Sequence, residues 1–114
     1  MQPIDPAPSL FPTGPISCSP AAIDALHEAG VYGFWLIYRH VTGDWGDDNP
    51  LAAANQAALA GDGSVVSRYR LAGSEIVVTT MYVRTATMRR TDICLAEEVE
   101  DQSEAVNVYF ILQW

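Results

Sequence analysis

The spacing of hydrophobic residues predicts helices in the first half of the chain. Ser19 followed by Pro20 indicates a helix start, because a hydroxyl can cap the first turn and proline suits the first helical position. The predicted helix ends near Ala29, where Gly30 can adopt the left-handed conformation that terminates helices. The residues expected on its buried side are Ala22, Ile23, Leu26 and Ala29.

The segment 31–41 has two interpretations. Its aromatic and β-branched residues favour a strand. Four of its hydrophobic residues nevertheless recur at helical spacing, namely Phe34, Ile37, Tyr38 and Val41. We predict a buried helix, which places His40 in the last turn and leaves a strand as the alternative.

An alanine-rich run at 51–60 predicts a third helix. Asp48 or Asn49 can cap this helix, Pro50 suits its first position and Gly61 ends it. Its apolar side is thin, so it requires close packing against another element. The residues expected on that side are Leu51, Ala54, Ala58 and Leu59, while Asn55 and Gln56 are polar exceptions.

In the second half of the chain the hydrophobic period changes to two, which is typical of half-buried strands. Residues 65–71, 75–84 and 88–96 form three predicted strands, and the short loops between them imply an antiparallel meander. Five carboxylates at 97–104 predict a solvated connector. The apolar segment 105–114 has strand propensity, so it should join the sheet edge or pair with its equivalent in a homodimer.

The chain of 114 residues has a length typical of one domain. Residues 1–19 contain five prolines and predict an extended N-terminal arm, which Leu10, Phe11 and Ile16 could attach to the domain at 20–114. We therefore predict an α+β fold. In it, two or three N-terminal helices pack on a three- to four-stranded, mainly antiparallel sheet.

The charge balance excludes one class of partner. All six basic residues are arginine, and the 14 acidic residues give a net charge of −8. Such a surface is not built to neutralise phosphates, so we expect no direct nucleic-acid binding. A net charge of this size is ordinary for a soluble domain, and it would also suit a basic protein partner.

Targeting and redox signals favour a cytoplasmic protein. The sequence predicts neither a signal peptide nor a membrane-spanning helix. The two cysteines are too few for a disulfide scaffold and fit no zinc spacing, so we expect reduced thiols. A bridge between Cys18 and Cys94 stays open as an alternative.

The loop between the second and third predicted helices concentrates the groups that could carry chemistry. The candidate site residues are His40, Asp44, Trp45 and Asp47. If the loop curls, His40, Asp44 and either Asp47 or Asp48 could hold a divalent cation or form a general base with an orienting acid. The alternative is a structural corner, in which Asp44 binds the backbone of the loop, Trp45 anchors it and Asp48 caps a helix. No other cofactor is predicted.

Arg68 and Arg70 are a second candidate site. Residues two apart in a strand share one face, so these two cations could bind a phosphate or a carboxylate. The alternative is that they pair with acids of the same domain, such as Glu75 or Asp92.

The motif His40-x-x-Gly43-Asp44-Trp45-Gly46-Asp47, followed by Asn55 and by the strand Val66-Ser67-x-Tyr69-x-Leu71, resembles a family of small bacterial proteins found on plasmids and other mobile elements. The likeness covers residues 21–98 and implies a loop between helices, ahead of a β-hairpin. Members of that family usually have an acidic residue soon after an Ile-Thr pair in the second strand, followed by Asp-Arg. The corresponding stretch here, residues 79–84, contains none. The family brings no established activity.

The sequence thus favours a non-catalytic binding protein, an accessory or anti-defence factor of a mobile element that acts through protein–protein contact. The motivation is small size, acidity, an apolar C-terminal segment and the lack of a complete catalytic set. The alternative is a metal-dependent enzyme or ligand-binding protein that uses the loop from His40 to Asp47.

Overall fold

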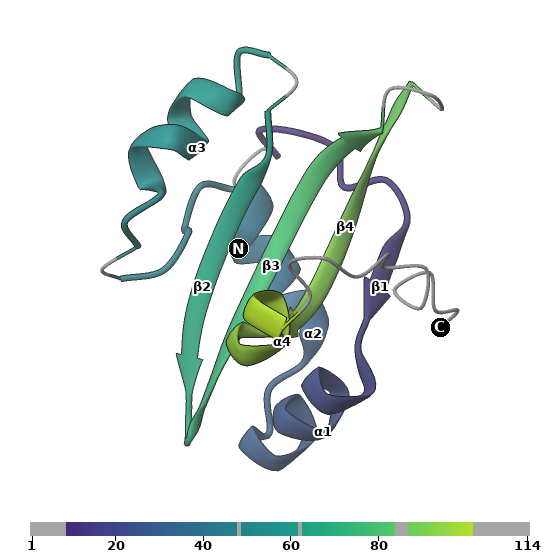
Figure 1. Ribbon diagram of the computed structural model, residues 1–114, viewed down its shortest axis with the longest axis vertical. Coiled ribbons are helices and arrows are strands. Elements are labelled where there is room, and N and C mark those ends of the chain that lie inside the picture. The colour runs from purple at the N-terminus through teal and green to yellow at the C-terminus, as the bar shows by residue number, and fades with distance from the viewer. Residues whose placement is uncertain (1–8, 48, 62, 84–86, 102–114) are drawn as a thin grey trace, which may run out of the picture.

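A computed structural model describes residues 9–47, 49–61, 63–83 and 87–101. It confirms the α+β fold, with a four-stranded mixed sheet in the order β1-β4-β3-β2 (Figure 1). The strands are β1 (Ile16–Cys18), β2 (Val65–Leu71), β3 (Ser74–Val83) and β4 (Met88–Leu95). The helices are α1 (Pro20–Ala29), α2 (Gly33–Val41), α3 (Ala52–Ala58) and α4 (Ala96–Asp101).

The three predicted strands form the antiparallel meander β2-β3-β4. Ser67 pairs with Val78, and Val78 pairs in turn with Ile93. These three residues therefore share one face of the sheet, and the alternation predicted from the sequence decides which face is buried. A two-residue turn at 72–73 joins β2 to β3.

The N-terminal segment supplies the fourth strand, which the sequence did not predict. Residues 16–18, assigned to the arm, pair in parallel with residues 91–93 of β4. Phe11 is buried in the core, and the Leu10 N–H donates to the Val41 carbonyl oxygen at 2.7 Å. The arm from residue 10 onward is therefore fixed to the body, whereas the predicted strand at 105–114 lies outside the described residues.

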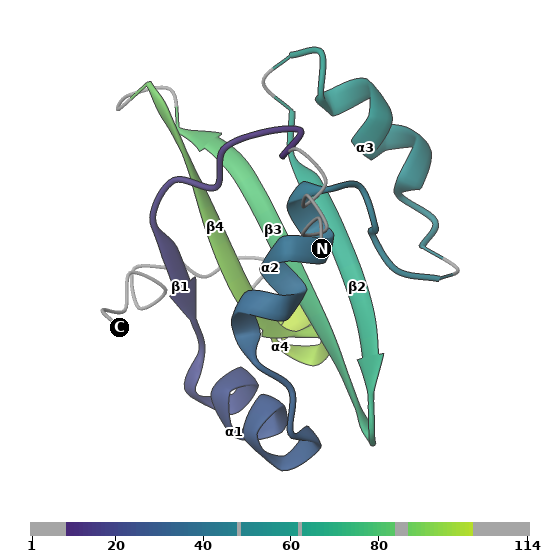
Figure 2. The same ribbon diagram turned by 180° about the vertical axis from the view of Figure 1, so that it is seen from behind.

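The helices cover the two faces of the sheet unequally. Helices α1 and α2 lie across one face, which Figure 2 turns toward the viewer, and they enclose the main core. The short helix α4 packs on the opposite face against Val77 and Cys94 (Figure 1). Helix α3 stands beside the edge strand β2. No helix among the described residues is long and apolar enough to cross a membrane.

Residues 97–101 were predicted to be a solvated connector, and the structure shows instead that they belong to the helix α4. The Glu98 side chain explains why the helix begins at Ala96. Its Oε1 accepts the Leu95 N–H at 2.8 Å and the Ser19 hydroxyl at 2.6 Å. A carboxylate that accepts a backbone N–H three residues earlier is a capping interaction, and it favours a helix here.

Helix α1 begins after Ser19 and ends at Gly30, as predicted. Its buried side is narrower than expected, because Ala22 and Leu26 are buried whereas Ile23 is exposed. The segment at 31–41 forms the helix α2 and not a strand, and two of the four residues predicted at helical spacing, Ile37 and Val41, are buried. The residues that face the core are Leu36, Ile37, His40 and Val41, while Phe34 and Tyr38 are exposed.

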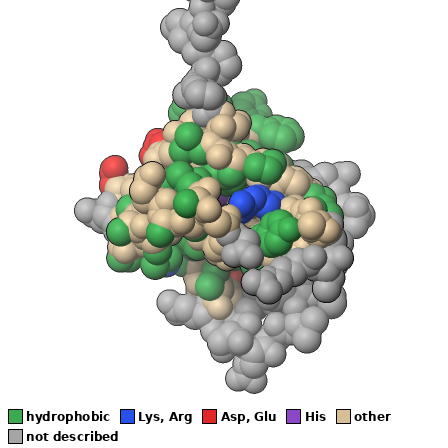
Figure 3. All heavy atoms as spheres, turned by 90° about the horizontal axis from the view of Figure 1, so that it is seen from above, with side chains coloured by type: hydrophobic (Ala, Val, Ile, Leu, Met, Phe, Trp, Pro, Cys, Tyr) green, Lys and Arg blue, Asp and Glu red, His purple; other side chains and the backbone are tan. Residues whose placement is uncertain are grey.

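Helix α3 is shorter than predicted, and Leu51 and Ala54 are exposed. Asn55, which had no expected role, is its most deeply buried side chain. Figure 3 views the molecule from the end that carries α3. The described surface there is mostly hydrophobic or neutral, with one small basic area and a few acidic side chains at the rim.

Candidate functional site

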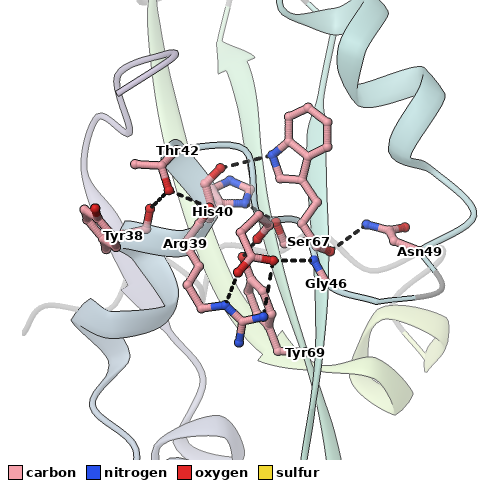
Figure 4. A network of polar contacts seen from close by, with 10 residues as sticks. Tyr38, Arg39, His40, Thr42, Gly46, Asn49, Ser67 and Tyr69 are labelled. Carbon is pink, nitrogen blue, oxygen red and sulfur yellow. Dashed lines mark hydrogen bonds and ion pairs between the residues drawn. The ribbon is translucent and has the colours of Figure 1, made fainter. Parts of the chain in front are cut away.

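His40 lies in the last turn of α2 and is fully buried. Its Nδ1 lies 2.6 Å from Ser67 Oγ on β2 (Figure 4), and its Nε2 lies 2.8 Å from Thr80 Oγ1 on β3. The chain of contacts continues from Thr80 to Thr91 Oγ1 at 2.6 Å, and from Thr91 to the Thr13 carbonyl oxygen at 2.9 Å. His40 therefore links α2 to three strands and to the N-terminal segment.

The hydroxyl protons of this network assign the tautomer of His40. Thr91 donates to a carbonyl oxygen, so it accepts from Thr80, and Thr80 accepts from the His40 Nε2–H. Nδ1 is then left to accept the Ser67 hydroxyl proton. Burial lowers the pKa of His40 to about 3, which keeps the ring neutral. Both ring nitrogens are thus committed to hydroxyl groups and not to a carboxylate.

Asp44 belongs to a different cluster at the surface. Its carboxylate accepts hydrogen bonds from Arg39 Nε at 2.7 Å and Nη2 at 3.2 Å, and from the Gly46 N–H at 3.4 Å (Figure 4). The hydrogen bond from Arg39 holds the pKa of Asp44 below its usual value. The Arg39 guanidinium also lies 4.5 Å from the centre of the Tyr69 ring, whose hydroxyl donates to the Asp44 carbonyl oxygen at 2.7 Å. These contacts fold the loop back onto α2 and β2.

Trp45 anchors the loop in the core. Its buried indole donates to the His40 carbonyl oxygen at 3.0 Å, and its own carbonyl oxygen accepts the Arg68 N–H at 3.1 Å. The next residue must be glycine. Gly46 has φ of 97°, and a Cβ there would lie 1.8 Å from the Arg68 carbonyl oxygen.

Two asparagines cover the outer edge of β2. The Asn55 side chain donates to the Val66 carbonyl oxygen at 2.7 Å and accepts the Val66 N–H at 2.8 Å. Asn49 donates to the same carbonyl oxygen at 2.9 Å, and its Oδ1 accepts the Leu51 N–H. An amide side chain thus pairs with this edge strand as a neighbouring strand would, which protects the edge from association.

The four predicted site residues therefore do not form one centre. The His40 imidazole is buried among hydroxyls, the Asp44 carboxylate pairs with Arg39, and Asp47 is exposed. The Trp45 indole donates to the backbone carbonyl oxygen of His40 and not to its imidazole. Within the described ranges, no group of three or more His, Cys, Asp or Glu side chains is placed to hold a metal ion. The contacts of this loop are those of a structural corner.

Arg68 and Arg70 line a polar hollow of about 430 Å³ at the edge of β2. The other residues that line it are Arg39, Gly46, Asp47, Tyr69 and Glu75. Arg68 pairs with Glu75 through two contacts of 3.2 Å, and this hydrogen bonding keeps the pKa of Glu75 below its usual value. An anion would have to compete with these acids, so anion binding by Arg68 and Arg70 stays a prediction.

Both described cysteines are free and buried, with burial raising the pKa of Cys18 and of Cys94 to about 12. They lie on opposite faces of the sheet, since Cys18 packs in the main core and Cys94 packs under α4. Neither is placed as a reactive thiol.

Sequence reasoning missed the aromatic surface on α2. We define it by the exposed side chains of Tyr32, Phe34, Trp35 and Tyr38. The rings of Trp35 and Tyr38 stack at a centroid distance of 5.7 Å. A signal was present in the sequence. Aromatic residues at 32, 34, 35 and 38 point in several directions around a helix, so one buried side cannot accommodate all of them.

Comparison with known protein families, with curated proteins and with solved structures finds no match. The resemblance to a mobile-element family therefore stays a prediction. The contacts and surfaces of the described residues are the basis on which a function can be proposed.

Proposed function

We propose that this protein is a non-catalytic binding protein that contacts a basic protein partner through the aromatic surface on α2. One observation carries the proposal. Tyr32 is 83% exposed, Phe34 77% and Trp35 53%, although each ring is large and apolar. A neighbouring exposed residue, Ile23 on α1, extends the apolar area.

Aromatic residues are enriched among the residues that dominate protein–protein binding, because they bury a large area at a small cost in conformational entropy. Contiguous apolar area on a soluble domain is typical of an interaction surface. Here the rings project from a helix whose other side is fixed in the core by Leu36, Ile37 and His40. The backbone that carries these rings is therefore held by the core, which reduces the conformational entropy lost on association.

Charge supports a basic partner. The chain carries a net charge of −8, and exposed Asp24 and Glu28 lie one residue from Ile23 and His27 on α1. Acidic charge beside an apolar patch speeds association with a cationic protein and disfavours acidic ones.

The finer parts of the proposal have separate support. An accessory or anti-defence role on a mobile element rests on the sequence resemblance alone. A cytoplasmic location is supported by the two free, buried thiols, which suit a reducing compartment. A homodimer formed through 105–114 rests on the strand propensity of that segment.

The test compares three forms of the tagged protein in lysate of its native cells. These are the wild type, the double variant Phe34→Ala/Trp35→Ala, and the control Leu51→Ala, which removes an exposed apolar side chain elsewhere. Captured proteins are quantified by mass spectrometry. We expect one basic protein at near-stoichiometric amounts with the wild type and the control, reduced at least tenfold with the double variant. Equal capture by all three forms, or an acidic protein as the main partner, would overturn the proposal.

Light scattering separates this contact from self-association. If the wild type is a dimer that the double variant converts to a monomer, the aromatic surface binds a second copy and the proposed basic partner is wrong. If removal of 105–114 abolishes a dimer and the double variant does not, the homodimer uses the C-terminal segment and the aromatic surface remains open to the partner.

A further inference from the structure

Two apolar hollows lie beside the aromatic surface, and we infer that together they form a groove for a basic peptide segment with apolar anchor residues. The inference rests on the proposed function and specifies how the partner is held. One hollow has a volume of about 460 Å³ and the other about 440 Å³. Both are lined by Tyr32 and Gly33, so they are adjacent and separated only by the start of α2.

The floor of the groove is the protein core. The first hollow reaches Ile93 on β4, which is fully buried, and Ile37 on α2. Its wall is formed by Ile16 and Phe34. The second hollow reaches Leu26 and is bounded by Ile23 on α1. Each hollow therefore offers apolar walls over a rigid base, and each volume exceeds that of a leucine or tryptophan side chain.

Gly33 keeps the groove open. Its φ lies outside the left-handed region, and a Cβ there would meet only Leu26 Cδ1, at an ordinary contact distance of 3.7 Å. The backbone thus does not require glycine at this position, and glycine lowers the stability of a helix relative to most residues. A Cβ at this position faces Leu26, so a larger side chain at 33 would enter the hollow that Leu26 lines. Glycine at 33 therefore leaves this side of the groove open.

The surrounding charge selects the flanking residues of the peptide. The described lining residues of the two hollows include no arginine, and His27 is the only titratable lining residue besides Tyr32. Asp24 and Glu28 lie beside this lining on α1. Exposed rings such as Tyr32 and Phe34 also attract guanidinium and ammonium groups through their π faces. Apolar anchors flanked by arginine or lysine therefore match the groove.

The probes are acetylated, amidated peptides in which one leucine and one tryptophan are separated by one to three arginines and flanked by arginine. A matched set carries glutamate in place of arginine. Binding to the full chain is measured at low ionic strength by NMR chemical-shift changes. We expect at least one arginine peptide to bind at least tenfold more tightly than its glutamate counterpart, with shifts centred on Gly33, Ile37 and Ile93.

The variant Gly33→Leu tests the groove without disturbing the fold. It should match or exceed the wild type in melting temperature, because leucine favours a helix more than glycine does. It should bind the arginine peptide at least tenfold more weakly than the wild type does. Control variant Gly61→Ala, at an exposed glycine with open space around its Cβ position, should bind like the wild type.

Equal binding of the peptide to the wild type and to Gly33→Leu would overturn the groove, as would shifts confined to other elements. The proposed function fails separately. If the lysate partner still depends on Phe34 and Trp35 but binds Gly33→Leu fully, the aromatic surface is the contact and the groove is not used. If no lysate protein depends on Phe34 and Trp35, the proposed function itself is wrong.

Discussion

The two sides of α2 use their residues in ways that residue type alone would not suggest. On the inner side, His40 has the chemistry of a catalytic or metal-binding residue, yet both its nitrogens hold the fold together. On the outer side, Phe34 and Trp35 have the chemistry of core residues, yet they face solvent. The comparison teaches that the most reactive side chain of α2 serves the fold, whereas the proposed function rests on the exposed rings.

The largest expected effect comes from the matched pair Trp45→Ala and Trp35→Ala. Trp45 is buried and donates a hydrogen bond to His40, so its removal should lower the free energy of unfolding by about 3–5 kcal/mol. Trp35 is exposed and stacks on Tyr38, so its removal should change that free energy by no more than about 1 kcal/mol. Urea denaturation of both variants measures the difference. Similar losses in the two would show that the outer ring is structural.

Asn55→Ala tests the cover on the edge of β2. The variant loses two hydrogen bonds to Val66 and leaves the Val66 N–H unpaired, while Asn49 still donates to the Val66 carbonyl oxygen, so we expect the free energy of unfolding to fall by about 1–3 kcal/mol. Its exposed neighbour provides the control, since Gln56→Ala should stay within about 0.5 kcal/mol of the wild type. Hydrogen exchange should also become faster at the Val66 N–H. An unchanged exchange rate there would contradict the proposed pairing.

His40 predicts a dependence of stability on pH. Its pKa is about 3 in the folded protein and 6.5 when unfolded, so between these values only the unfolded chain binds the proton. The neutral His40 ring therefore contributes to the free energy of unfolding in full above pH 6.5. This contribution is lost as the pH falls toward 3, at about 1.4 kcal/mol per pH unit. From pH 6.5 to 4.5, the wild type should therefore lose about 2–3 kcal/mol more than His40→Gln.

The pKa values of the Asp44 and Glu75 carboxyl groups are lowered in the folded protein, so their protonation in acid also reduces stability. The wild type and His40→Gln share this loss, and it cancels when the two are compared. Parallel pH profiles for the wild type and His40→Gln would mean that the ring is not held neutral. Glutamine is the suitable replacement, because its amide can still donate toward Thr80 from the position of Nε2.

The smallest effects are expected at the two loop carboxylates. Asp44→Asn breaks an exposed ion pair with Arg39 and should cost no more than about 1 kcal/mol. Asp47→Asn should leave the melting temperature unchanged. Adding Mg²⁺, Mn²⁺, Zn²⁺ or Ca²⁺ checks the alternative function. A rise in melting temperature that is lost in both Asp47→Asn and His40→Ala would restore the loop as a metal site.

The loop from His40 to Asn49 shows how far the site could be predicted. The interpretation of this loop as a structural corner followed from the sequence, because glycines allow a turn and the large apolar indole of Trp45 favours burial. The partners of His40 could not be predicted. Ser67 and Thr80 are 27 and 40 residues away, and hydroxyl residues in a strand carry no signal that marks them as partners of a distant imidazole.

The sequence by itself determined the helix boundaries at Ser19 and Gly30, the three-strand meander and the α+β class, because caps, turns and periodicity act between near neighbours. Only the tertiary structure decided that residues 16–18 join the sheet beside β4, and which side of α2 faces the core. Several phases of an aromatic-rich helix are nearly equal in local energy. One orientation of the helix is selected by its packing against the sheet and by the hydrogen bonds of His40 to the hydroxyl groups of Ser67 and Thr80.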